Sequence, residues 1–255
     1  MPRRLDLALL PAEALAIDAD CYVIIDVLRA TTTIATLFAG GLEELAVTGT
    51  IEGARELARV DDRLLLGEVG GVRPEGFDNG NSPVEAACAD VRGRKAALFT
   101  TNGTAALCAL AGRGDVYAGA IANASAVAGR LARYRRSVFV CAGTEGGARF
   151  ALEDFAAAAV MIQRAVRIVP GLELGDAAGL AMTSTGYEDW LAPGLPQQPG
   201  RSSRLLSGSR NGRALTALGF GADIHFAMRE DTSRALPMVV SCGPGVAVLQ
   251  DAALD

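Results

Sequence analysis

A carboxylate, a guanidinium and three hydroxyls lie where an apolar segment gives way to a helical pattern. Residues 23–33 read VIIDVLRATTT and contain Asp26, Arg29, Thr31, Thr32 and Thr33. A helix start offers free N–H groups and a positive dipole end, and arginine adds paired donors, so this stretch suits an anionic ligand. A carboxylate belongs there if a cation separates it from the anion, or if it attacks the anion. The alternative is that Thr31 simply caps the helix while Asp26 and Arg29 form a structural ion pair.

A second strand-to-helix loop, residues 64–83, reads LLLGEVGGVRPEGFDNGNSP. Glu68 again has the position of a carboxylate at a strand end. Polar side chains that could complete an anion site follow it, at Asn79, Asn81 and Ser82. The alternative is an ordinary capped turn, which accounts for Ser82 and Pro83 as the cap and first residue of a helix.

A third loop, LFTTNGTAAL at residues 98–107, repeats the arrangement with small polar residues. The residues predicted to bind an anion there are Thr101, Asn102, Gly103 and Thr104. The alternative is a capped helix after a glycine turn. A fourth loop precedes Glu153 and Asp154 within the predicted helix of residues 150–166. One of these two acids could face the site, whereas the alternative makes both of them solvent-facing helix residues.

Alternating strands and helices must position these loops. Apolar, often β-branched runs predict strands within residues 21–27, 44–50, 63–69, 95–101, 115–122, 137–143 and 235–243. Helical patterns between most of them predict a mostly parallel sheet with helices on its faces, which brings the strand ends to one edge. We expect a single α/β domain over residues 1–255, with residues 186–200 as the irregular stretch at which two lobes could separate.

The composition narrows the classes of function. The net charge is −5 and no Lys/Arg block occurs, which argues against nucleic-acid binding. Five dispersed cysteines and one histidine, His225, argue against a disulfide scaffold or a zinc site, so any metal must be held by oxygen, as Mg²⁺ is. Because no export signal or membrane span is visible, we expect a cytoplasmic protein. An apolar composition with few aromatic residues is compatible with a homodimer.

The four loops together resemble the 2-phosphosulfolactate phosphatase (ComB-type) family. The matching stretches are VIIDVLRATTTI, LLLGEVGGVRPEGFDNGNSP, LFTTNGTAAL and VFVCAGTEGGARFALEDFAAA, with a weaker match over residues 209–239. The resemblance implies a three-layer α/β/α fold with a mostly parallel or mixed sheet and a Mg²⁺-dependent phosphatase. It also implies (R)-2-phospho-3-sulfolactate as substrate, hydrolysed to 3-sulfolactate and phosphate on a route to coenzyme M.

The resulting hypothesis gives each loop a role. Asp26, Glu68 and one of Glu153 or Asp154 hold Mg²⁺, while Arg29, the threonine-rich helix start and the polar loops bind a small phosphorylated substrate. Either a metal-bound water or a carboxylate, Asp26 first, attacks phosphorus. Three alternatives stay open: a non-catalytic protein that binds a phosphorylated metabolite, a phosphoryl transferase, and a phosphatase with a different substrate.

Overall fold

Within the part of the chain that the structure describes, ten strands form one mixed, mostly parallel sheet. A computed structural model describes residues 3–184 and 201–253, and the irregular stretch predicted at 186–200 lies outside them. The strand order is β4-β5-β3-β10-β9-β6-β2-β7-β1-β8. The strands are β1 (Arg3–Ala8), β2 (Cys21–Ile25), β3 (Glu44–Thr48), β4 (Leu64–Gly67), β5 (Lys95–Phe99), β6 (Asp115–Gly119), β7 (Arg136–Cys141), β8 (Leu172–Leu174), β9 (Pro237–Gly243) and β10 (Val246–Asp251).

Two antiparallel strands interrupt the parallel sheet at its middle. β9 and β10 form a hairpin that pairs with β3 on one side and β6 on the other. The junction with β6 is short, since its one registered pair is Tyr117 with Met238. The other strands pair in parallel, for example β2 with both β6 and β7. All seven predicted strands are present, and the predicted mostly parallel sheet is confirmed.

Helices follow most of the strands, as the sequence pattern predicts. Their starts have local causes: the Thr50 side chain accepts a hydrogen bond from the Gly53 N–H, and Ser82 caps the next helix by accepting from the Glu85 N–H. The helices are α1 (Pro11–Leu15), α2 (Ala30–Ala39), α3 (Ile51–Asp61), α4 (Pro83–Cys88), α5 (Gly103–Leu110), the short 3-10 helix η1 (Ile121–Asn123), α6 (Ala124–Leu131), α7 (Leu152–Ile168), α8 (Asp176–Ser184), α10 (Arg201–Gly208), α11 (Arg210–Ala217) and α12 (Gly221–Ala227).

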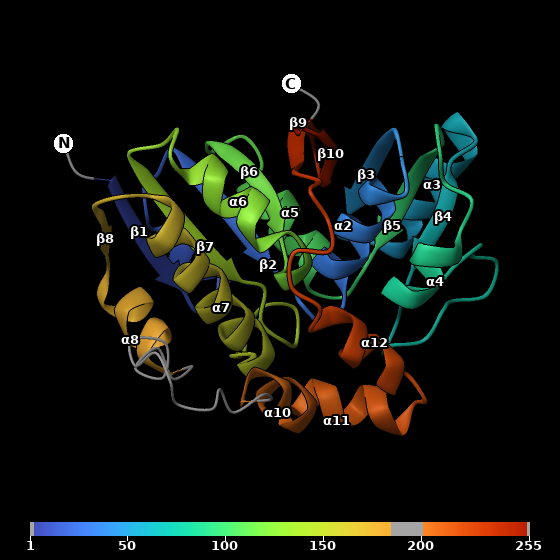
Figure 1. The fold of residues 1–255 in the computed structure, drawn as a ribbon. Coiled ribbons are helices and arrows are strands. Elements are labelled where there is room, and N and C mark those ends of the chain that lie inside the picture. The colour runs from blue at the N-terminus through green and yellow to red at the C-terminus, as the bar shows by residue number, and fades with distance from the viewer. Residues whose placement is uncertain (1–2, 185–200, 254–255) are drawn as a thin grey trace.

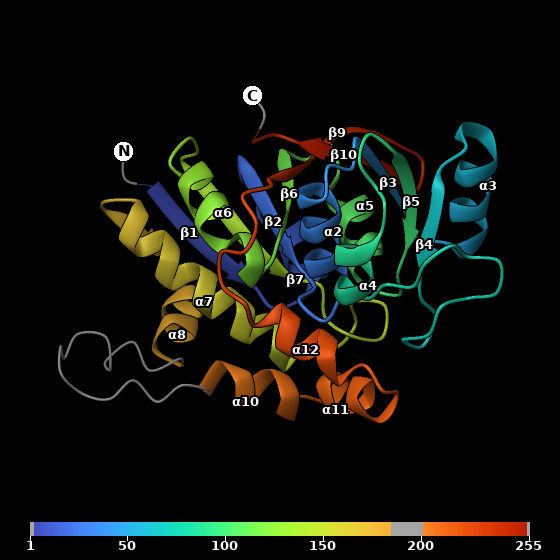
Figure 2. The ribbon, with the colours of Figure 1, turned by 45° about the vertical axis from the view of Figure 1, so that its right-hand side comes forward.

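The helices cover both faces of the sheet, which makes the three-layer α/β/α fold that the resemblance implies (Figures 1 and 2). On one face, α2 and α5 share an apolar cluster with residues of β2 and β6 and also with residues of β3 and β5. Helices α6, α7 and α8 cover the other face of β1, β2 and β7. Because α2 and α5 contact both halves of the sheet, loops after β2 and β5 can meet although four strands separate them.

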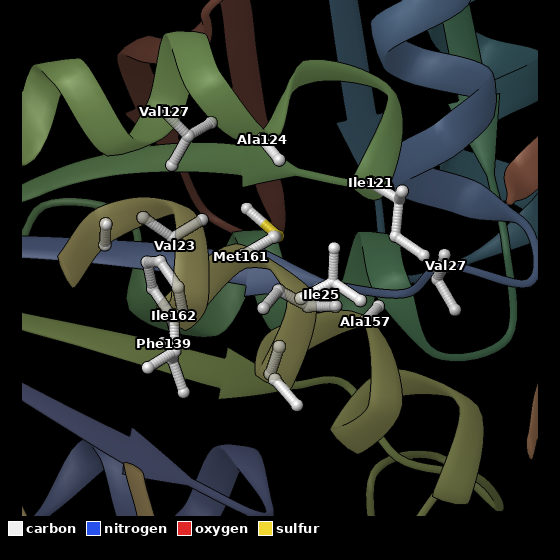
Figure 3. Packing of buried hydrophobic residues seen from close by; sticks show 14 of the residues in the cluster. Val23, Ile25, Val27, Ile121, Ala124, Val127, Phe139, Ala157, Met161 and Ile162 are labelled. Carbon is white, nitrogen blue, oxygen red and sulfur yellow. The ribbon is translucent and has the colours of Figure 1, made fainter. Parts of the chain in front are cut away.

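The core between β2, β6 and α7 is packed closely (Figure 3). Val23, Ile25 and Phe139 project from the strands toward Met161 and Ile162 of α7. Gly119 at the end of β6 admits this packing, since a Cβ there would lie 2.8 Å from Met161 Cε. None of the helices in the described ranges is long and apolar enough to cross a membrane.

A run of C-terminal helices crosses the edge at which β2, β4, β5 and β7 end. In both overall views α10, α11 and α12 lie one after another below these strands (Figures 1 and 2). α10 and α11 contact α7, and α12 contacts α4, so the run joins the two sides of the molecule.

Candidate active site

A pocket of about 370 Å³ opens between the carboxyl-terminal strand ends and α11. Four strand-end loops contribute to it, after β2, β4, β5 and β7. The lining residues are Asp26, Leu28, Arg29, Glu68, Gly70, Gly71, Asn81, Thr101, Asn102, Thr144, Glu145, Arg210, Asn211, Ala214 and Leu215. The sequence prediction that polar strand-end loops meet at one edge therefore holds, and six of the predicted site residues line this pocket: Asp26, Arg29, Glu68, Asn81, Thr101 and Asn102.

Two buried carboxylates, Asp26 and Glu68, face the pocket. Asp26 follows β2 and is 7% exposed, and the Ala30 N–H donates to its Oδ1 over 3.4 Å. Glu68 follows β4 and is 8% exposed. Its Oε2 accepts from the Gly71 N–H at 2.6 Å, and its Oε1 accepts from both the N–H and the hydroxyl of Thr101 at 2.9 Å. The loop after β5 thus fixes the orientation of the Glu68 carboxylate.

The pKa of Asp26 is raised to about 7, well above its ordinary value of 3.8. Burial is the main cause, and the negative charge of Glu68 is the next. Hydrogen bonds from the amides of Ala30 and Gly103 oppose the rise. A buried carboxylate whose pKa is raised beside a second negative charge is typical of a site that receives positive charge.

Arg29 lies at the base of the pocket and is held on three sides. Its Nη1 is 2.9 Å from Oδ2 of Asp223 on α12, and its Nη2 donates to the Gly71 carbonyl at 2.6 Å. The guanidinium carbon lies 4.4 Å from the ring centroid of Phe220. The Ser82 hydroxyl donates to the other oxygen of Asp223 at 2.6 Å. Arg29 pairs with Asp223 rather than with Asp26, unlike the ion pair considered from sequence.

The three threonines at the start of α2 are buried and use their hydroxyls within the protein. Thr31 Oγ1 accepts from the Asp26 N–H, Thr32 donates to the Val27 carbonyl, and Thr33 donates to the Asn81 carbonyl. These bonds stabilise the β2–α2 loop and join it to the loop before α4. The threonines do not line the pocket, and their predicted contact with substrate stays a prediction.

The loop after β5 supplies Thr101 and Asn102 to the pocket, while Gly103 and Thr104 support it from behind. A Cβ at Gly103 would lie 2.6 Å from Asp26 Oδ2, so glycine lets α5 start against this carboxylate. Thr104 exchanges hydrogen bonds with Thr100. Asn102 Oδ1 accepts from the Gly146 N–H at 2.9 Å, which ties this loop to the one after β7.

Of the three polar residues predicted before α4, Asn81 alone lines the main pocket. Its Oδ1 is buried and has no hydrogen-bond partner within the part of the chain that the structure describes. Asn79 and Ser82 line a separate small cavity beside α2. Ser82 acts as the α4 cap, as the alternative prediction proposed, and also donates to Asp223.

Glu153 and Asp154 are both buried, which excludes the alternative that both face solvent. Asp154 accepts from the Val27 N–H at 3.0 Å and the Gly143 N–H at 3.1 Å, so it joins the loops after β2 and β7. Burial and the nearby charges of Asp26 and Glu153 raise the pKa of Asp154 well above its ordinary value. Glu153 lines a side cavity of about 160 Å³ that shares Thr144 and Arg210 with the main pocket.

The donor set at the pocket fits a hard cation held partly by the protein. In residues 3–184 and 201–253, no three Asp, Glu, His or Cys side chains form a group that could hold a metal ion. Asp26 and Glu68, however, are oxygen donors whose mutual repulsion a divalent cation would relieve. Mg²⁺ is commonly bound by one or two carboxylates together with water and substrate phosphate. The third protein ligand, Glu153 or Asp154, stays a prediction.

Several site residues were missed from sequence because they lie on segments that showed no strand-end signal. Arg210 and Asn211 reach the pocket from the start of α11, and Asp223 supports Arg29 from α12. Ser209 caps α11 by accepting from the Gly212 N–H, a pattern that could have located this helix start. Their proximity to Asp26 depends on long-range packing, which local spacing does not reveal.

Sequence comparison agrees with this geometry. A family model described as 2-phosphosulpholactate phosphatase matches residues 9–241. The chain belongs to the 2-phosphosulfolactate phosphatase family. A relative from Deinococcus radiodurans, named a probable 2-phosphosulfolactate phosphatase, is 38% identical and aligns over 87% of this chain and 88% of its own length. Relatives with the same name from Thermotoga petrophila and Thermus thermophilus are 34% and 36% identical, over 90% and 92% of this chain and 92% and 94% of their own.

The match to the 2-phosphosulfolactate phosphatase family spans every element that builds the pocket. It begins before Asp26 and ends after Asp223, and so includes α11 and α12 as well as the four strand-end loops. The resemblance seen from the loop sequences is therefore confirmed, and the C-terminal helices are part of the family's shared region.

Proposed function

We propose that the protein is a Mg²⁺-dependent phosphoric monoester hydrolase. Its proposed reaction is hydrolysis of (R)-2-phospho-3-sulfolactate to 3-sulfolactate and phosphate. The observation that carries this proposal is the pair of buried carboxylates, Asp26 and Glu68, in one pocket with the buried cation Arg29. Membership of the family, and the names of relatives that align over most of the chain, supply the substrate.

Asp26 and Glu68 would hold the metal ion from the base of the pocket. The ion supplies charge neutralisation of the phosphoryl oxygens and polarisation of the leaving oxygen. Glu68 is held by the Thr101 and Gly71 donors, so its carboxylate is ordered before substrate arrives. Ordering of this kind lowers the cost of assembling the charged transition state.

Arg29 would bind an anionic oxygen of the substrate, and its own surroundings prevent it from swinging away. Asp223, the Gly71 carbonyl and the Phe220 ring fix its guanidinium. The amide side chains of Asn81 and Asn102 add polar groups around the same space. Positioning and charge stabilisation of this kind are the main requirements of phosphoryl transfer.

Asp26 has two candidate roles, attack on phosphorus or activation of the attacking water. In the first, a new bond joins Asp26 Oδ to phosphorus while the ester P–O bond breaks, and water then releases phosphate. In the second, water attacks directly and Asp26 accepts its proton. The stereochemical course at a chiral phosphoryl group separates them, because two successive in-line displacements at phosphorus retain its configuration, whereas direct attack by water inverts it.

The test of the function is phosphate release from 2-phosphosulfolactate and other phosphorylated hydroxyacids, each with Mg²⁺ and with EDTA. Metal-dependent release from 2-phosphosulfolactate supports the proposal. Release only from another ester would keep the chemistry and change the substrate. Ligand-dependent thermal stabilisation without release would instead identify a binding protein.

A further inference from the structure

The cations that line the main pocket within the described chain are Arg29 and Arg210. They differ in how firmly they are held. Arg29 is buried against Asp223, Gly71 and Phe220. The Arg210 side chain is 70% exposed, and it pairs with Glu145 at 2.8 Å. The pocket therefore has one fixed cation at its base and one exposed cation at its mouth.

Glu145 holds Arg210 only loosely. The same oxygen of Glu145 also accepts from Arg149 at 3.1 Å, and the Glu145 side chain is 48% exposed. Arg210 and Arg149 together hold the pKa of Glu145 below its usual range, so the carboxylate stays ionised. Exposed ion pairs contribute little free energy, which means that an anion entering the pocket can replace Glu145 as the partner of Arg210.

The backbone that carries Arg210 is fixed close to Asp26. The neighbouring Asn211 donates from Nδ2 to the Leu28 carbonyl at 2.6 Å, and Leu28 lies in the loop after β2. Ser209, on the other side, caps α11. The base of the Arg210 side chain is thereby anchored to the loop that carries Asp26 and Arg29, while its guanidinium is free to change partner.

We propose that Arg210 is the specificity residue that receives a second anionic group of the substrate, a carboxylate or a sulfonate, in exchange for Glu145. Arginine suits this role because its planar donors match an oxoanion in a paired geometry. The inference rests on the proposed function and narrows it. The favoured substrates are phosphate monoesters that carry a second oxoanion, and esters with a neutral tail lose this contact.

The experiment compares wild type with Arg210→Ala on three esters: 2-phosphosulfolactate, 2-phospholactate and isopropyl phosphate. Isopropyl phosphate replaces the carboxylate of 2-phospholactate with a methyl group. We expect Arg210→Ala to raise KM for 2-phosphosulfolactate by about 10- to 100-fold with little change in kcat, and to leave isopropyl phosphate unaffected. A KM rise shared by 2-phospholactate assigns the carboxylate to Arg210, and a rise confined to 2-phosphosulfolactate assigns the sulfonate.

Arg149→Ala is the matched control. Arg149 has a 62% exposed side chain and contacts the same Glu145 oxygen, but it does not line the main pocket. Relative to wild type, Arg149→Ala should change the ratio of the KM values of any two of the esters by less than about twofold. Glu145→Gln should act in the opposite direction and lower KM for 2-phosphosulfolactate by about two- to fivefold, because Arg210 is released. An equal loss on all three esters in Arg210→Ala would overturn the proposal.

A binding measurement separates this inference from the proposed function. Calorimetric titration with 3-sulfolactate, which has both acidic groups and no phosphate, does not depend on turnover. We expect Arg210→Ala to weaken its binding by about 10-fold or more and Arg149→Ala to leave it unchanged. If Arg210→Ala loses binding of 3-sulfolactate but wild type releases no phosphate from any ester, the role of Arg210 stands and only the proposed phosphatase function is overturned. Wild-type protein that binds no 3-sulfolactate, or equal binding by both variants, would overturn the role of Arg210.

Discussion

Asp26 is the residue at which stability and function oppose each other most directly. It is buried beside Glu68, and these two facts raise its pKa to about 7. In the unfolded chain the same carboxyl ionises near its ordinary value of 3.8. Between these values the unfolded chain releases a proton that the folded protein keeps, so the folded state loses stability as the pH rises.

Asp26→Asn should therefore stabilise the metal-free protein while removing phosphatase activity. In EDTA we expect no large change near pH 4 and a gain in the free energy of unfolding of about 2–4 kcal/mol above pH 7, because asparagine carries no charge to bury. Urea denaturation at pH 4 and pH 8 measures this difference. Adding Mg²⁺ at pH 8 should stabilise wild type and leave the variant unchanged. Wild-type activity retained in Asp26→Asn would refute the role of this carboxylate.

Gly103 is the second residue whose identity the site requires. A Cβ at this position would lie 2.6 Å from Asp26 Oδ2 and 2.8 Å from the Ala30 Cβ. Gly103→Ala should lower stability by about 1–3 kcal/mol and displace the Asp26 carboxylate, with at least about a tenfold loss of kcat/KM.

Gly129→Ala provides the control for Gly103→Ala. Gly129 lies within α6, and a Cβ there would meet no atom within 4 Å. Alanine is favoured over glycine inside a helix, so this variant should gain about 0.5–1 kcal/mol and keep full activity. Thermal unfolding and steady-state kinetics of both variants measure these differences. Equal stability and equal kcat/KM in the two variants would contradict the tight approach of α5 to Asp26.

Helix α12 supports the site from outside the strand-end loops. Its Asp223 is 2% exposed and links the Arg29 guanidinium with the Ser82 hydroxyl. Asp223→Ala leaves a buried cation without its carboxylate, which typically costs about 3–5 kcal/mol. We expect that loss in urea denaturation, and a raised KM for the phosphorylated substrate because Arg29 is no longer held in place.

Two further variants test whether that effect comes from Asp223 as a partner of Arg29. Asp223→Asn keeps an acceptor for one of the two donors and should lose less stability than Asp223→Ala. Glu230→Ala removes an exposed partner of Arg164 and should cost less than about 1 kcal/mol. If Asp223→Ala were as mild as Glu230→Ala, the buried pair would not be what orders Arg29.

The strand-end elements were predictable because their signals are local. Each apolar run that leads to Asp26, Glu68 or Thr101 is followed directly by its polar loop, and the parallel connection fixes which end of the strand carries it. Roles within the loops were less predictable. The hydroxyls of Thr31, Thr32 and Thr33 bond within the protein, because a buried loop must satisfy its own polar groups. The predicted contact of these threonines with an anion stays a prediction.

Other elements could not be identified from local pattern. Strand β8 has three residues, and β1 begins with two arginines, so neither shows a clear apolar run. Strand β10 reads VAVLQD and its place beside β3 depends on a long-range pairing. Arg210 and Asp223 belong to helices whose approach to the loop after β2 is set by tertiary contacts, which sequence spacing does not encode.

At the scale of the whole molecule, the hairpin of β9 and β10 holds the two halves of the sheet together. Leu249 of β10 is fully buried in the cluster that contains α2 and α5, whereas Leu172 lies half-buried on the edge strand β8. Leu249→Ala should cost about 2–5 kcal/mol, and Leu172→Ala about 1 kcal/mol. Denaturant unfolding measures both losses. Equal losses would mean that the hairpin contributes no more to the stability of the sheet than the edge strand β8 does.

The position of this hairpin also sets the order in which a newly made chain can finish folding. Residues 237–251 are synthesised after all the other strands that the structure describes, yet they fill the gap between β3 and β6. Until they leave the ribosome, both of those strands carry an open edge that can pair with another chain. We therefore expect the nascent protein to be prone to aggregation until these residues have left the ribosome, and chaperone depletion should reduce its soluble yield more than that of a protein whose last strand is at a sheet edge.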